Sequence, residues 1–139
     1  MADINLNADQ IAIVDPAQAE IHDQIAAESV TRGAALHITS AGKAGLADAN
    51  AAGKQQFRGI SLGKGGAGQG ISLLKRGKVA GFDLSALAYD APVYLSDTVG
   101  RLADTAGTLS VLVGRVVALT DSDRTKVLYI EADWLRAWA

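Results

Sequence analysis

The chain has 139 residues, no cysteine, and 13 basic against 15 acidic residues, which gives a formal net charge of -2. This length predicts one domain, and the absence of cysteine excludes a disulfide scaffold, a thiolate metal site and a cysteine nucleophile. The balanced charge and the lack of a long apolar run predict that neither nucleic acid nor a membrane is a partner.

Residues 1–19 are expected to form an extended N-terminal arm. Apolar and polar residues alternate at its start, and a β-like run at 11–14 ends at Asp15-Pro16. A terminal strand with no hairpin partner nearby often adds to the sheet of another chain. We therefore assign to partner contact the apolar residues Ile4, Leu6, Ile11 and Ile13. The arm lacks the basic and then apolar pattern of a secretory signal, which favours a protein made and kept in a cytosol.

The stretch 17–27 fits two structures. Ile21 and Ile25 lie four residues apart, as on one face of a helix, but residues 21–26 also read as an extended segment. We favour the strand. From this point onward, residues 20–139 are expected to form a single β domain.

An internal duplication organises this domain. The strand-like run at 35–40, with Gly45-Leu46-Ala47-Asp48 after it, recurs as the run at 92–97 with Arg101-Leu102-Ala103-Asp104 after it. A turn precedes each run, with glycine in the first copy and aspartate in the second. Two further apolar runs follow in each copy, at 57–62 and 71–74 and at 111–117 and 126–130.

The duplication predicts two similar three-strand units, as pseudo-repeats at about 30–77 and 87–131. Between them, residues 75–84 are expected to form a turn, a short strand and a link. Two such units would build a compact, mainly β domain of the β-barrel or β-tulip type.

The C-terminal residues 131–139 are expected to form a short helical tail. They have helical propensity and place both tryptophans of the chain, Trp134 and Trp138, four residues apart on one helical face. The two rings would then be neighbours. They would either cover the end of the chain's own barrel or anchor a neighbouring chain, since tryptophan is favoured at the centres of interfaces.

Three groups of residues could be taken for ligand or catalytic sites, and each has a structural interpretation. The glycine loop 63–70 lacks the Lys-Ser/Thr of a Walker motif and leads into a strand, so we interpret it as a mobile hairpin loop that becomes ordered against a partner. Asp48 and Asp104 occupy equivalent repeat positions, where aspartate caps a turn. His22 and His37 lack a second ligand at metal or catalytic spacing. No catalytic residue, metal site or cofactor is therefore expected.

Several segments between about residues 20 and 130 together form a moderately specific pattern. They are Glu28 to Leu36, Gly59-Ile60-Ser61-Leu62, Leu74 to Gly81, and Ala91-Pro92-Val93-Tyr94-Leu95-Ser96-Asp97 through Leu102-Ala103-Asp104-Thr105. This combination resembles the small capsid cement, or head decoration, proteins of tailed bacteriophages. The resemblance implies a mostly β protein that sits outside the expanded capsid, commonly forms trimers at threefold positions and has no enzymatic activity.

The resemblance predicts a viral structural protein that bridges subunits of the major capsid protein as a homotrimer. It would be made in the host bacterial cytoplasm and act on the outer surface of the virion. The alternative is a small-molecule or glycan-binding β-barrel module with the glycine loop as a lid, although only 5% of the residues are aromatic. A third hypothesis, an enzyme that uses Asp48 and Asp104, requires the two carboxylates to converge on one substrate.

Overall fold

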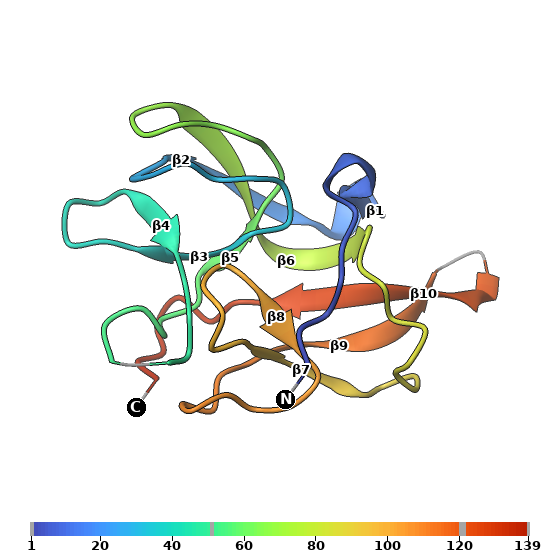
Figure 1. The fold of residues 1–139 in the computed structure, drawn as a ribbon. Helices are drawn as coiled ribbons and strands as arrows, with labels where there is room; N and C mark the ends of the chain where they lie inside the picture. The colour runs from blue at the N-terminus through green and yellow to red at the C-terminus, as the bar shows by residue number, and fades with distance from the viewer. Residues whose placement is uncertain (1, 51, 120–121, 139) are drawn as a thin grey trace.

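The protein is mainly β, as the sequence predicts. The computed structural model describes residues 2–50, 52–119 and 122–138, and its strands form one antiparallel sheet that curls into a half-barrel (Figure 1). Two 3₁₀ turns, η1 (Ala8–Gln10) and η2 (Pro16–Gln18), are the helical elements of the described residues. The strands are β1 (Ala12–Val14), β2 (Glu20–Ile25), β3 (Ala35–Ile38), β4 (Ala44–Leu46), β5 (Gly59–Ser61), β6 (Gly70–Ala80), β7 (Pro92–Leu95), β8 (Leu102–Ala103), β9 (Leu112–Leu119) and β10 (Ser122–Glu131).

The order of the strands reflects the duplication. Along the main path of the sheet it reads β4-β3-β5-β6-β10-β9-β7-β8, so each copy follows the same order outward from the central pair β6 and β10. Each copy contributes four strands rather than the predicted three, because the segments around Leu46 and Leu102 form the short strands β4 and β8. Two like units with a pseudo-twofold relation therefore build the half-barrel.

A matching turn precedes β3 and β7. Gly33 and Asp90 have positive φ angles of 85° and 64°. The Gly33 amide donates to the Ser61 carbonyl at 2.8 Å, and the Asp90 amide donates to the Val116 carbonyl at 2.6 Å. Glycine adopts a positive φ freely and aspartate tolerates it. The predicted equivalence of these two turns is confirmed.

A second matching pair of residues brings the backbones of neighbouring strands close together. A Cβ at Gly59 would lie 2.5 Å from the Leu74 carbonyl oxygen, and a Cβ at Gly114 would collide with the Tyr129 carbonyl oxygen. The two glycines occupy equivalent places on β5 and β9, against β6 and β10. The close approach of β5 to β6, and of β9 to β10, therefore requires glycine at both positions.

The predicted turn between the repeats is wrong, because β6 continues without interruption from Gly70 to Ala80. The register with β2 shifts between Glu20 and Ile21, as in a β-bulge. Gly77 lies just beyond this shift, where the partner of β6 changes from β2 to β1; its φ is 144°, and a Cβ there would be only 3.1 Å from the Ala19 Cα. A glycine that reads as a turn in the sequence instead allows the longest strand to bend.

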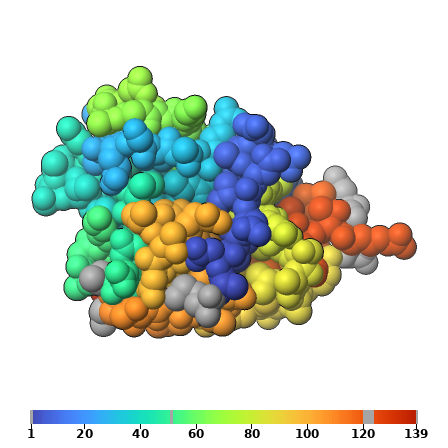
Figure 2. All heavy atoms as spheres, viewed as in Figure 1, coloured from blue at the N-terminus to red at the C-terminus, as the bar shows by residue number. Residues whose placement is uncertain are grey.

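The N-terminal arm lies against the chain's own body. Figure 2 shows it in blue across the surface, and β1 pairs with β6 while the Ile4 amide donates to the Leu102 carbonyl at 2.8 Å. Ile4 and Ile11 are each 5% exposed, and Leu6 and Ile13 are partly buried against the same core. In this conformation Ile4 and Ile11 belong to the core of their own chain. Contact between the arm and a partner stays a prediction.

Candidate functional site

The C-terminal tail, residues 132–138, contains no helix, in contrast to the prediction. β10 ends at Glu131, a tight turn follows at 134–135, and the Arg136 amide donates to the Asp133 carbonyl at 3.2 Å. The remaining described residues of the tail are extended or irregular. The tail therefore crosses the end of the sheet as a turn fastened to the body.

Side chains from the segment before β5 replace the hydrogen bonds that a helix would make. The Arg58 guanidinium donates to the carbonyls of Asp133 at 3.3 Å and Arg136 at 3.2 Å. The Gln56 side chain accepts from the Trp138 amide at 2.8 Å and donates to the Trp138 carbonyl at 2.9 Å. An isolated helix of this length is marginal in water, so these long-range bonds decide the conformation. Partial burial lowers the pKa of Arg58, and nearby Asp133 opposes that effect.

The two tryptophan rings have different partners, so the predicted contact between them is absent from this conformation. The Trp134 ring lies 4.6 Å from the His22 ring between centroids, and its indole nitrogen donates to the Arg58 carbonyl at 2.7 Å. The Trp138 ring lies under the Arg136 guanidinium at 3.8 Å. Both rings pack against the core of their own chain. They fasten the tail, and their contact with a partner stays a prediction.

A cluster of charged side chains on β2 and β6 also contacts Trp134. The Glu20 carboxylate lies 2.9 Å from His22 Nε2, 2.9 Å from Lys75 Nζ and 3.5 Å from an Arg76 nitrogen. Lys75 Nζ is also 5.6 Å from the centre of the Trp134 ring. Glu20 thus binds both His22 and Lys75, the side chains of this cluster that contact Trp134.

The Glu20→Gln variant is expected to be less stable than the parent protein at neutral pH and to differ less as the pH falls. The hydrogen bond with His22, followed by that with Lys75, lowers the pKa of Glu20 from 4.5 to about 2. Because the folded-state pKa is the lower one, the stabilisation is complete above the unfolded pKa and is lost as the pH falls toward 2.

Urea unfolding of both proteins from neutral pH downward measures this difference. Added salt should reduce the difference in the free energy of unfolding at neutral pH, because the cluster is partly exposed and its charges are screened. If this difference in unfolding free energy stays constant down to pH 2, ionised Glu20 does not stabilise the fold through this cluster.

Leu135 is the residue of the tail that sequence reasoning missed. It lies in the tight turn and is 98% exposed, the highest value among the exposed large apolar residues of the described chain. Its amide donates to the Asp133 carboxylate at 3.0 Å. A helical interpretation of the tail gave no reason to single out this leucine. The sequence signal for an exposed position was the charge on both sides of Leu135, from Asp133 and Arg136.

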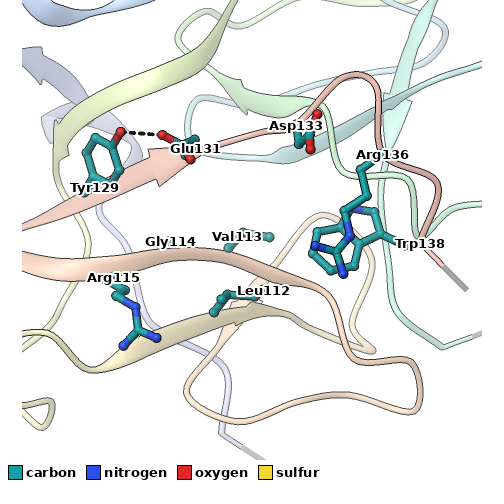
Figure 3. A pocket seen from close by; sticks show the side chains of 9 residues that line it. All are labelled: Leu112, Val113, Gly114, Arg115, Tyr129, Glu131, Asp133, Arg136 and Trp138. Carbon is teal, nitrogen blue, oxygen red and sulfur yellow. Dashed lines mark hydrogen bonds between the residues drawn. The ribbon is translucent and has the colours of Figure 1, made fainter.

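A shallow pocket of about 280 Å³ separates the tail from β9 and β10 (Figure 3). In it the Tyr129 hydroxyl donates to Glu131 at 2.8 Å, and burial, followed by this carboxylate, raises the pKa of Tyr129. The Arg136 guanidinium closes one face of the Trp138 ring to a ligand. The lining residues are Leu112, Val113, Gly114, Arg115, Tyr129, Glu131, Asp133, Arg136 and Trp138.

The glycine loop is hydrogen-bonded within the chain. The Gly65 amide donates to the Val30 carbonyl at 3.0 Å, and the Gly66 amide donates to the Gln69 side chain at 2.7 Å. Amides engaged in this way are not available to bind phosphate. Ordering of the loop against a partner stays a prediction.

The other polar residues singled out in the sequence have structural contacts. Asp48 accepts a hydrogen bond from the Asn50 amide at 3.1 Å, and Asp104 accepts one from the Ala2 amide at 2.9 Å. His37 is 8% exposed, and burial lowers its pKa, which favours the neutral imidazole. Asp48 thus caps its own turn as expected, whereas Asp104 binds the N-terminal arm instead.

No protein-family model, no curated protein and no solved structure matches the chain. Within residues 2–50, 52–119 and 122–138, no three His, Asp or Glu side chains gather as a metal ion would require. No helix in that part of the chain has the length and apolar character needed to cross a membrane. The function therefore has to be inferred from the surface.

Proposed function

We propose that the protein is a capsid decoration protein of a tailed bacteriophage, which binds the outside of the head and bridges subunits of the major capsid protein. The supporting observation is a β body whose arm and tail are bonded to the sheet and which leaves large apolar side chains exposed at separate places. These side chains include Ile21, Ile25, Tyr89 and Leu135. A protein that bridges several subunits needs a rigid body with more than one contact. We propose further that it acts as a homotrimer on the virion surface and is made in the host bacterial cytoplasm.

We assign the contact with the major capsid protein to β2 rather than to the arm. Ile21 and Ile25 lie on the same face of β2 and are 42% and 50% exposed. β2 pairs with β6 and with no other strand of the described residues. An unpaired strand edge with apolar side chains can receive a strand or loop of a partner.

The Ile21→Lys/Ile25→Lys variant is expected to lose binding to expanded heads of the phage that carries this gene. Two lysines would place charge on the apolar contact and raise the Kd by about 30-fold or more. Co-sedimentation of the variant with heads stripped of the parent protein measures the loss. The fold should be unchanged, because both side chains already face solvent.

Val99→Lys is the matched control, because Val99 is also an exposed apolar residue, at 46%, and lies outside β2, between β7 and β8. This control should bind heads as the parent protein does. Unchanged head binding by the β2 variant would remove β2 as the contact. Failure of the parent protein to bind heads would overturn the proposed function itself.

A glycan-binding module is the second candidate, and the pocket beside Trp138 is the observation in its favour. Two acidic side chains, two arginines and two aromatic residues line that pocket. Screening the parent protein on a glycan array tests this function. Selective binding that Trp138→Ala abolishes would favour it over capsid decoration.

A further inference from the structure

We propose that Leu135 of one copy docks into an apolar hollow on a second copy of the chain. The hollow is formed by Tyr89, Asp90, Val116, Val117 and Ala118, and we call it the β9 hollow. The inference deepens the proposed self-association by naming the two faces that meet, and it rests on that self-association.

The Leu135 turn is held in place before any partner arrives. Arg58 donates to the carbonyls on both sides of Leu135, those of Asp133 and Arg136. Trp134, the preceding residue, is fixed by its hydrogen bond to the Arg58 carbonyl. A single exposed leucine is ordinary on a protein surface. One that is 98% exposed on a fastened turn presents apolar area at little further cost in conformational entropy.

The β9 hollow offers a surface of matching chemistry. It has a volume of about 430 Å³, and the area that lines it is largely apolar. Tyr89 is 43% exposed, and Val117 and Ala118 are partly exposed. An aliphatic side chain that enters the hollow would remove apolar surface from water on both partners.

The positions of the two features exclude contact within one molecule. The tail lines a pocket together with Leu112, where β9 begins, whereas the hollow lies along residues 116–118 near the other end of β9 (Figure 1). Leu135 is almost fully exposed, so it does not fill the hollow of its own chain. A second copy brings the same turn to the hollow.

The charges around the two features are complementary. Asp133 and Arg136 flank Leu135, whereas Asp90 lines the hollow and has Arg115 beside it, with 3.9 Å between their charged groups. The Asp90 side chain is 87% exposed and that of Arg115 is 46% exposed, so both can reach a partner. Docking with Arg136 toward Asp90 would pair opposite charges beside the leucine and favour one orientation of the contact.

Light scattering of the full chain across a concentration series tests the inference. Leu135→Glu and Val117→Glu are each expected to raise the Kd of self-association by about 30-fold or more, because each places a charge in the apolar contact. Val99→Glu is the matched control and should associate as the parent protein does. Tyr89→Ala serves as a second hollow variant outside the sheet, in case Val117→Glu fails to fold.

Mixing the two variants provides the decisive measurement. A Leu135→Glu chain keeps its hollow and a Val117→Glu chain keeps its leucine, so the mixture should form a species of two chains that neither variant forms alone. A charge reversal should act in the same direction as the apolar variants. Arg136→Glu should weaken association, because it would bring a carboxylate toward Asp90.

The outcomes separate this inference from the proposed function. Association of the parent protein that Leu135→Glu leaves unchanged, or a mixture that stays monomeric, would overturn the inference alone. A parent protein that stays monomeric at every concentration would overturn both the inference and the proposed homotrimer. Head binding is read from the β2 variant and does not depend on either result.

Discussion

Gly114→Ala is expected to lower the free energy of unfolding by about 3 kcal/mol, the largest effect of any substitution considered for this protein. A Cβ at this position would collide with the Tyr129 carbonyl oxygen, which is backbone and cannot rotate away. Relief requires β9 to move from β10, and these two strands form the centre of the second unit. Urea unfolding followed by circular dichroism measures the loss.

Gly59→Ala is expected to behave in the same way, because Gly59 is the equivalent residue of the first unit and its Cβ would lie 2.5 Å from the Leu74 carbonyl oxygen. Gly70→Ala is the matched control. Gly70 also lies on a strand, but nothing is found within 4 Å of its Cβ position, so the change should stay within about 0.5 kcal/mol. Equal effects of all three substitutions would contradict the packing argument.

Arg58→Met is expected to release the C-terminal tail and to lower the free energy of unfolding by about 2 kcal/mol. Methionine keeps an apolar stem but leaves the carbonyls of Asp133 and Arg136 without their donor. Tryptophan fluorescence should report greater solvent exposure of Trp134, and hydrogen exchange at the tail amides should become faster.

Arg32→Met is the matched control for this prediction, because Arg32 is exposed in the turn before β3. It should unfold as the parent protein does. If Arg58→Met retained the parent fluorescence and the parent exchange rates, the tail would be held chiefly by the tryptophans and glutamines.

The alternation of short apolar runs and turn residues along the sequence was enough to predict most of the strands, because each unit repeats it. Gly33 and Asp90 were recognised as equivalent since both types of residue tolerate the positive φ that the turn needs. Gly77 was misread as a turn because a close backbone approach within a strand and a turn between strands both favour glycine. The pairing of β6 with β10 was not predicted, because it joins residues far apart in the chain.

The candidate site was harder to predict, because its conformation depends on contacts that no local pattern contains. Trp134 and Trp138 were recognised as important, but helical propensity gave the tail the wrong conformation. Arg58, Gln55 and Gln56, which hold the tail, lie about 80 residues away in the chain, as the separations of their hydrogen bonds show. The exposure of Leu135 follows from those bonds alone.

The docking of the N-terminal arm bears on the order in which the chain folds during synthesis. The arm is synthesised before the residues on which it docks, because β1 pairs with residues 78–80 and Ile4 bonds to Leu102 in the second unit. Ile4 and Ile11 must therefore remain in contact with water or with a chaperone until most of the chain has been made. The arm therefore docks late in folding, and its docking joins the first unit at β6 to the second unit at Leu102.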